Sequence, residues 1–512
     1  MLALSLLTTG LAAPVATPER IIMKFGGSSV RDAERITEVC KLCQMQIENG
    51  MKPHMVCSAM GSTTNNLLKA ADMAISDNIV DLSAVTDLHR ETAETLGFLE
   101  APAYLEVVQL LDECKKTLEG VAMLGELSTR TRDRIVSYGE RCSGRMVAAC
   151  LEEMGTPAVQ IESWDLGLTT SSKFGDASVL DSCWPTLKEK IHAISDNTVA
   201  VITGFIGKDS EGSITTLGRG GSDLTASLLG AAAGYDEVQV WKDVDGILSA
   251  DPRVVGWENA VPVPFVSYTE AAELAYFGAK VLHPVAMQPA VKTGLPVRVK
   301  NSYNPEAAGT LITSDFTQKG PVSAITSKSE ITVVDIQSTR MLGSYGFLSQ
   351  VFESFKRHKL SVDVVATSEV SVSLTLNKPI EILSKVQEGP INQQWAANVQ
   401  DNGLRSVIED LDSCSTIDIK PGRSIITLIA NVKESSSVMA TVFEVLNEMG
   451  VQVEMISQGA SKVNISLVIP GEHEKAVIKA LHACFFEDAC MVPLLGDDAP
   501  KRGPPVEKDT PK

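Results

Sequence analysis

The sequence predicts a doubly wound α/β domain followed by two smaller, ferredoxin-like α+β modules. Up to residue 301, short apolar strands alternate with longer helical patterns, which is typical of a sheet covered by helices on both faces. The segment 302–322 then carries two prolines and two glycines and is typical of a linker. Beyond it a pattern recurs after about ninety residues, and a chain of 512 residues is long for a single core.

The first domain is expected to begin with a strand, a glycine turn and a helix. An apolar run ends in the motif KFGGSSV, which starts at Lys24, and a charged periodic segment predicts a helix over 32–47. Polar helical periodicity over 86–120 predicts an outlying pair of helices. Buried strands are expected at 21–24, 55–57, 200–202 and 238–241.

The second part of the chain repeats the order strand, helix, strand, strand, helix, which is the pattern of a ferredoxin-like module. Sheets of this kind commonly pair edge to edge, so dimerisation through this region is expected. A purely structural repeat is the alternative, and the polar loop 343–346 at a helix start favours ligand binding instead. The expected helices are 346–358 and 436–449, and the expected strands are 362–368, 370–376, 453–457 and 462–469.

Composition limits the possible partners. A net charge of −19 at pH 7 argues against nucleic acid or an anionic membrane as a partner. Residues 1–18 are apolar, lack acids and resemble a signal-peptide core without its basic flank, which leaves a truncated start or an unusual targeting segment open. The polar tail 496–512 is expected to be disordered.

The ten cysteines are scattered, which suits a reducing compartment better than a disulfide framework. Cys40 and Cys43 form a single C-x-x-C, for which two buried thiols are a better interpretation than a zinc site, and no resident metal is expected. Asn464 fits the glycosylation pattern by chance, because it stands in a strand-like run.

A glycine-rich loop is the strongest functional signal. The chain reads TTLGRGGSDLTASLLGAAAG from Thr215 to Gly234, so glycines, Arg219 and Asp223 precede a small-residue helix. Glycine lets backbone N–H groups approach an anion closely, and a helix N-terminus favours negative charge. Because neither a G-x-x-x-x-G-K-[ST] nor a G-x-G-x-x-G motif occurs, a different kind of phosphate-handling protein is predicted.

Six motifs in a fixed order give this chain a resemblance to aspartate kinases. The motifs are KFGGSSV, SAMGSTTNNLL, SYGERCSGRMVAACL, GFIGKDSEGSITTLGRGGSDLTA, VWKDVDGILSADPR and AAELAYFGAKVLHP. The chain is similar to the plant-type, monofunctional, lysine-sensitive members from about residue 20 to about residue 486, with an amino-acid-kinase fold and tandem ACT domains. The resemblance implies a kinase domain at 19–316 and ACT domains at 328–420 and 421–495. Residues 1–18, which depart from the long, basic transit peptides of plant-type members, are expected to be a targeting-like or disordered segment, and 496–512 a disordered tail.

The resemblance implies transfer of the γ-phosphoryl group of ATP, supplied with Mg²⁺, to the β-carboxylate of L-aspartate. The product, 4-phospho-L-aspartate, opens the synthesis of lysine, threonine and methionine. A carboxylate acceptor with a pKa of about 4 is already ionised at neutral pH, so no general base is required. The seven dispersed histidines agree with this, and His283 is expected to be a packing residue.

Lys24 is the candidate transition-state cation, because it stands at the end of an apolar strand and one residue separates it from Gly26 and Gly27. The resemblance adds Asp223 as the residue that orients cations and Lys280 as a second phosphate cation. It places the acceptor's ammonium on Glu140 and its carboxylate on Arg219, with Ser58 and Thr64 lining the pocket. The expected ATP-binding residues are Lys24, Gly26, Gly27, Ser28, Gly220, Gly221, Lys242, Asp243, Arg253 and Lys280.

A regulatory site for lysine is expected at the start of the first repeat. A loop entering a helix offers N–H groups to a carboxylate, and two acids can pair with the two ammonium groups of lysine. The resemblance implies Met341, Ser344, Gly346, Phe347, Leu348, Asp363, Ser368 and Glu369 as this site.

Two other functions remain open. One is a kinase of the same fold acting on acetylglutamate, glutamate or UMP, against which the tandem repeats count. The other is a catalytically inactive amino-acid sensor, against which the presence of Lys24, Arg219 and Asp223 counts. The resemblance implies a plastid location and a homodimer or higher oligomer, with the cytoplasm as the alternative compartment.

Overall fold

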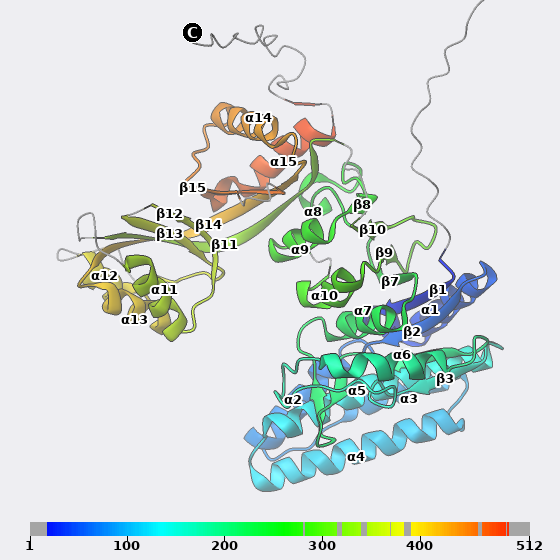
Figure 1. Ribbon diagram of the computed structural model, residues 1–512. Coiled ribbons are helices and arrows are strands. Elements are labelled where there is room, and N and C mark those ends of the chain that lie inside the picture. Colours follow the sequence, from blue (N-terminus) through cyan, green and yellow to red (C-terminus); the bar gives the residue numbers. More distant parts are fainter. Residues whose placement is uncertain are drawn as a thin grey trace, which may run out of the picture. The chain divides into compact units, whose positions relative to one another are not determined.

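The computed structural model describes residues 18–279, 282–314, 320–338, 346–368, 370–382, 391–458, 463–487 and 489–490. The chain divides into two compact units (Figure 1). The first unit contains the chain up to Asp245 together with Val285–Thr313, and the second contains Gly246–Pro284 and everything from Ser314 onward. In the part of the chain so described, no helix combines the length and apolarity needed to cross a membrane.

The first unit is built on a mainly parallel sheet. Every neighbouring pair of strands in it is parallel except the last, in which β10 runs antiparallel to β9. The four strands expected from the sequence are confirmed as β1, β2, β4 and β7. The order is β3 (Ala158–Ile161), β4 (Val199–Thr203), β2 (Lys52–Cys57), β1 (Arg20–Phe25), β7 (Glu237–Lys242), β9 (Val297–Asn301) and β10 (Thr310–Ile312).

Helices cover both faces of this sheet, as alternate residues of β1 show. Ile21 and Met23 belong to the core shared with α1 and α5, whereas Ile22 faces the helix that contains Gly230. The expected outlying pair of helices is confirmed as α3 and α4. The helices and the small hairpin of this unit are α1 (Ala33–Glu48), α2 (Thr63–Ser76), α3 (Ser83–Leu96), α4 (Pro102–Leu124), α5 (Thr129–Glu153), α6 (Trp184–His192), α7 (Gly221–Ala233), α10 (Pro284–Thr293), β5 (Ile206–Lys208) and β6 (Ile214–Thr216).

The second unit contains one six-stranded sheet. Two of its strands, β11 and β14, are unusually long and pair with each other in antiparallel fashion along their length. The order is β12 (Val362–Thr367), β13 (Ser371–Leu376), β11 (Val322–Ser338), β14 (Ser415–Ala430), β16 (Asn464–Pro470) and β15 (Met455–Ser457). The helices are α8 (Pro252–Val255), α9 (Tyr268–Tyr276), α11 (Phe347–Arg357), α12 (Ile391–Asn398), α13 (Asn402–Leu411), α14 (Ser435–Glu448) and α15 (Glu474–Phe486).

The two ferredoxin-like modules share the long strands β11 and β14. The later part of β11 and the first part of β14 enclose one core with α11 and α13, which contains Val334 and Phe355. The start of β11 and the end of β14 enclose another core with α14 and α15, which contains Val322 and Val442. The predicted boundaries, 328–420 and 421–495, leave residues 322–327 outside both modules, whereas here those residues pair with the end of β14.

The segment Gly246–Pro284 packs within the second unit, although the expected kinase domain at 19–316 contains it. The Ile325 N–H donates to the Ser249 carbonyl oxygen at 2.6 Å. His482 on α15 is fully buried and hydrogen-bonds the Ser249 hydroxyl at 2.8 Å. These contacts tie the segment after β7 to strand β11 and to the last helix.

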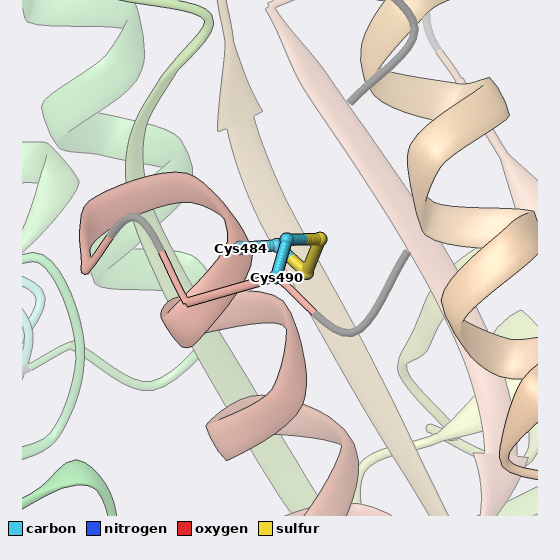
Figure 2. Close-up of a disulfide and its surroundings, with 2 residues drawn as sticks. All are labelled: Cys484 and Cys490. Atoms are coloured by element: carbon cyan, nitrogen blue, oxygen red, sulfur yellow. A yellow bond between two sulfur atoms is a disulfide. The ribbon is translucent and has the colours of Figure 1, made fainter. Parts of the chain in front are cut away.

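One disulfide is present, contrary to the expectation from scattered cysteines. Cys484, near the end of α15, bonds Cys490, six residues further along (Figure 2). The chain turns back at the helix end, which the residue spacing alone does not reveal. The other eight cysteines are free and buried, Cys40 and Cys43 among them, as expected for that pair.

Candidate active site

A buried ion pair lies at the carboxyl end of the central strand β1. Lys24 Nζ is 2.6 Å from Asp223 Oδ1, and the two side chains are only 10% and 12% exposed. The strand delivers Lys24 because its register pairs it with Val56 of β2 and Val240 of β7, both fully or almost fully buried. Asp223 comes from the first turn of α7. Taking two charges out of water is costly, so such a pair at a strand end indicates a functional rather than a stabilising role.

The glycines after Lys24 allow a close approach of two backbones. A Cβ atom at Gly27 would lie 2.7 Å from the Ala59 carbonyl oxygen, and one at Gly26 would lie 3.7 Å from Lys24 Nζ. The Gly61 N–H donates to the Gly27 carbonyl at 3.0 Å, so the turn after β1 rests on the loop after β2. The exposed hydroxyl of Ser28 follows directly.

The glycine-rich loop forms the entrance to α7. Gly218 and Gly220 have φ angles of 70° and 75°, a region that side-chain-bearing residues rarely adopt. A Cβ atom at Gly221 would lie 2.7 Å from the ring of Phe205. Arg219, between Gly218 and Gly220, is exposed and forms no hydrogen bond or ion pair with another described residue. Its guanidinium is therefore available for an oxyanion beside the N-terminus of α7.

Glu140 presents an unpaired oxygen inside the protein. This residue of α5 is 3% exposed, and Oε1 accepts a hydrogen bond from the Ala59 N–H at 3.3 Å. Oε2 is buried and has no hydrogen-bond partner among the described residues. Burial raises the pKa of Glu140 to about 8, and the charge of Lys24 opposes this only in part. A buried, unpaired carboxylate oxygen is the partner that an ammonium group needs.

Hydroxyl groups and a second lysine complete this cluster. Ser58, which follows β2, donates from its hydroxyl to that of Ser222 at 3.1 Å, and Thr64 lies half-buried in the first turn of α2. At the end of β7, burial lowers the pKa of Lys242, and Asp223 opposes this effect. Asp243 is exposed beside it. The carboxyl ends of β1, β2 and β7 thus meet the N-terminus of α7, which is where α/β sheets bind ligands.

Two further residues of this region, Ser222 and Phe205, were not predicted from the sequence as part of the site. Ser222 accepts the hydrogen bond from Ser58, and a Cβ atom at Gly204 would lie 2.6 Å from it. Phe205 has a φ of 69° and donates its N–H to the Thr225 hydroxyl at 3.1 Å. Neighbouring glycines in GFIG and GRGGS were the available signal for this tight packing.

The remaining predicted residues lie in the second unit or outside the described residues. Arg253 at the start of α8 is largely exposed and pairs with Asp251 at 2.6 Å.

The residues of the predicted lysine site lie partly within the described residues. Asp363 on β12 pairs with Lys328 at 2.7 Å and accepts a hydrogen bond from the Tyr276 hydroxyl at 2.8 Å. Gly346 has a φ of 90° and precedes α11, in which Phe347 is buried and Leu348 is exposed, and the Ser368 hydroxyl contacts that of Ser371. Lys280, Met341, Ser344 and Glu369 lie outside the described residues.

Comparison with known proteins gives consistent matches over both units. Residues 19–301 match the model of the amino acid kinase family, and residues 426–485 match that of the ACT domain. The chain is 44% identical over 502 residues to aspartokinase 1, chloroplastic, of Arabidopsis thaliana, covering 95% of this chain and 84% of that protein. It is 32% identical to the lysine-sensitive aspartokinase 3 of Escherichia coli, covering 92% and 100%.

Two solved structures of one enzyme are similar to this chain. The E. coli aspartokinase III in complex with aspartate and ADP (R-state) has a TM-score of 0.72 and 31% identity, covering 91% of this chain and 99% of the other. The complex of that enzyme with lysine and aspartate (T-state) has a TM-score of 0.72 and 30% identity with the same coverage.

Proposed function

The chain belongs to the aspartokinase family, and from that premise we propose that it transfers the γ-phosphoryl group of ATP to the β-carboxylate of L-aspartate. The product is 4-phospho-L-aspartate, and the step opens the synthesis of lysine, threonine and methionine. The observation that carries the proposal is the buried Lys24–Asp223 pair at 2.6 Å. The glycine turn after Lys24 packs on the loop at Ala59, and the Ala59 N–H donates to Glu140, whose Oε2 is unpaired among the described residues.

Phosphoryl transfer requires positioning and charge neutralisation rather than covalent help from the protein. In the proposed reaction Lys24 stabilises the charge on the transferring group, and Asp223 holds the lysine at the end of β1. Lys242 and the proposed Lys280 add positive charge on the nucleotide side. ATP arrives with Mg²⁺, and the N–H groups of Gly26, Gly27, Gly220 and Gly221 are available to its phosphate oxygens.

The acceptor is proposed to bind between two opposite charges. Glu140 takes the α-ammonium group with its free Oε2, and Arg219 takes the α-carboxylate with its planar fork. Ser58 and Thr64 line the same side of the pocket. The β-carboxylate is ionised without assistance, so no residue is needed to remove a proton.

A substrate panel tests the proposal. With ATP and Mg²⁺, we expect ADP formation to depend on L-aspartate and to be absent with acetylglutamate, glutamate or UMP. A coupled ADP assay measures this directly. Turnover with another acceptor of the panel, or lysine binding without any turnover, would favour another kinase of the fold or an inactive sensor.

We also propose that lysine inhibits the enzyme through the first ACT module. Support comes from the lysine-sensitive relative, from the left-handed Gly346 at the start of α11, and from the two acids Asp363 and Glu369 in the sequence that follows. Inhibition requires lysine to bind a low-activity state more tightly than an active one.

Glu369→Ala is expected to shift the lysine inhibition curve to concentrations at least several-fold higher, because an ammonium partner worth about 1.5–3 kcal/mol is removed. Uninhibited turnover should stay near the parental value. Glu353→Ala, which changes an exposed acid on α11 of the same module, is the control and should leave the curve in place. Dose–response curves measure both. A parental enzyme indifferent to lysine would contradict the regulatory proposal.

A plastid location and self-association complete the proposal. Relatives named chloroplastic support the first. The ferredoxin-like sheet of the second unit supports pairing of two chains, because sheets of this kind commonly pair edge to edge. Imaging of a fluorescent fusion and light scattering of the purified protein would test these two statements.

A further inference from the structure

Asp133 is a buried acid that the proposed reaction does not use. It lies on the first turns of α5 and is 2% exposed. Its Oδ2 accepts hydrogen bonds from the N–H groups of Thr216 and Gly175, both at 2.9 Å, and its Oδ1 accepts one from the Thr216 hydroxyl at 3.0 Å. One carboxylate therefore holds three donors from two separate segments of the chain.

Both segments border the start of the loop that carries Arg219. Thr216 is the last residue of β6, and its carbonyl accepts a hydrogen bond from the Ala177 N–H at 2.8 Å. A Cβ atom at Gly218 would lie 3.0 Å from the Asp176 carboxylate, so the loop leaves β6 directly against the segment that Asp133 holds. The position of Asp133 thus determines where this loop begins.

The same helix presents Glu140. Asp133 and Glu140 are seven residues apart, which is about two helical turns, so both side chains project from one face of α5. Both are buried. Helix α5 therefore carries Glu140, the proposed partner of the ammonium group. Through Asp133 and Thr216, the same helix also holds the start of the loop with Arg219, the proposed partner of the carboxylate.

We propose that Asp133 is a positioning residue that sets the separation between Glu140 and Arg219 and thereby selects acceptors with an α-amino-acid group. The inference rests on the proposed function, because it takes Glu140 and Arg219 as the two partners of that group. Small displacements of binding groups have large kinetic effects. The acceptor depends on Asp133 through both Glu140 and Arg219, whereas ATP depends on it only through Gly220 and Gly221, which are two of its several proposed contacts. ATP binding should depend on Asp133 far less than aspartate binding does.

Three variants and one control test this. Asp133→Ala removes the acceptor of all three hydrogen bonds, and we expect the aspartate KM to rise about tenfold or more while the ATP KM stays near the parental value. Asp133→Asn keeps a carbonyl oxygen that accepts from the two N–H groups. Its NH₂ group can donate to the Thr216 hydroxyl oxygen in place of the original bond, so the aspartate KM should be close to parental. Thr216→Val removes one hydrogen bond alone and should raise the aspartate KM by a smaller factor.

Asp209→Ala is the matched control. Asp209 is also buried, lies in the β5–β6 hairpin, and accepts hydrogen bonds from the Ser213 and Glu211 N–H groups at 2.8 and 3.0 Å. It borders the opposite end of β6, so its loss should affect thermal stability without a selective rise of the aspartate KM.

The outcomes are distinguishable. A selective rise in Asp133→Ala with rescue in Asp133→Asn supports the inference. An unchanged aspartate KM, an equal rise of both KM values, or the same selective effect in Asp209→Ala overturns it. Should Asp133→Ala not fold, Thr216→Val decides: a raised aspartate KM supports the inference and an unchanged one overturns it. Failure of the proposed function appears instead in the parental protein, as absent aspartate-dependent ADP formation.

Discussion

Lys24→Met is expected to lower kcat by on the order of a hundredfold or more, because the cation that stabilises transition-state charge is lost. Methionine keeps the length and the apolar stem of the side chain, so the end of β1 should remain in place. The measurement is aspartate-dependent ADP formation at saturating concentrations of both substrates. Lys41→Met, which changes an exposed lysine on α1, is the control and should retain parental activity.

The Lys24→Met variant also leaves Asp223 buried without its partner, which by itself destabilises a protein by about 3–5 kcal/mol. Adding Asp223→Asn removes that charge. The double variant should recover most of the lost thermal stability but none of the lost kcat. If kcat recovered with stability, the effect of Lys24 would be structural, and its assignment to catalysis would be wrong.

Glu140→Gln is expected to raise the aspartate KM by a factor that corresponds to about 1.5–3 kcal/mol, because a charged hydrogen bond to the ammonium group is weakened. The ATP KM should change little. Glu152→Gln, on an exposed position of the same helix, provides the control. A large change in the ATP KM with an unchanged aspartate KM would contradict the assignment of Glu140 to the acceptor site.

The pKa of Glu140, raised to about 8 by burial, gives this prediction a pH signature. Below pH 8 the free site holds a proton that an ammonium ligand must displace, so the parental aspartate KM should fall as the pH rises from 6.5 to 8.5. The Gln variant should lack this dependence. Because the folded pKa lies above the unfolded value of 4.5, the ligand-free parental protein loses stability as the pH rises between the two values, and Glu140→Gln should not.

Local patterns in the sequence were sufficient for much of the fold and pointed to the motifs that contain Lys24 and Asp223, which form a buried ion pair. Strand β1 and helix α1 follow from an apolar run, a glycine turn and an amphipathic segment, with Asp32 capping the helix through the Arg35 N–H. Lys24 and Asp223 stand in motifs whose composition suits phosphate. These features depend on residues that are neighbours in the chain.

What escaped prediction depends on contacts between distant residues. That Val322 pairs with Ala430 cannot be read from either segment, because both are ordinary strand sequences. Asp133 sits in a polar helical stretch that resembles a solvated face, and only the packing of β6 against α5 buries it. The turn that joins Cys484 to Cys490 is likewise a product of tertiary structure.

The division of the chain between two units has a consequence for how such a protein can be taken apart or evolve. The polypeptide passes from one unit to the other three times, after Asp245, after Pro284 and after Thr313. A deletion that begins at the 302–322 linker would remove strand β11 and helix α15. The segment Gly246–Pro284, which packs on both, would then be left exposed. A regulatory part joined by a single hinge can be gained or lost by gene fusion in one event. Here the chain crosses between the two units three times, so replacing one unit also requires changes in the sequence of the other.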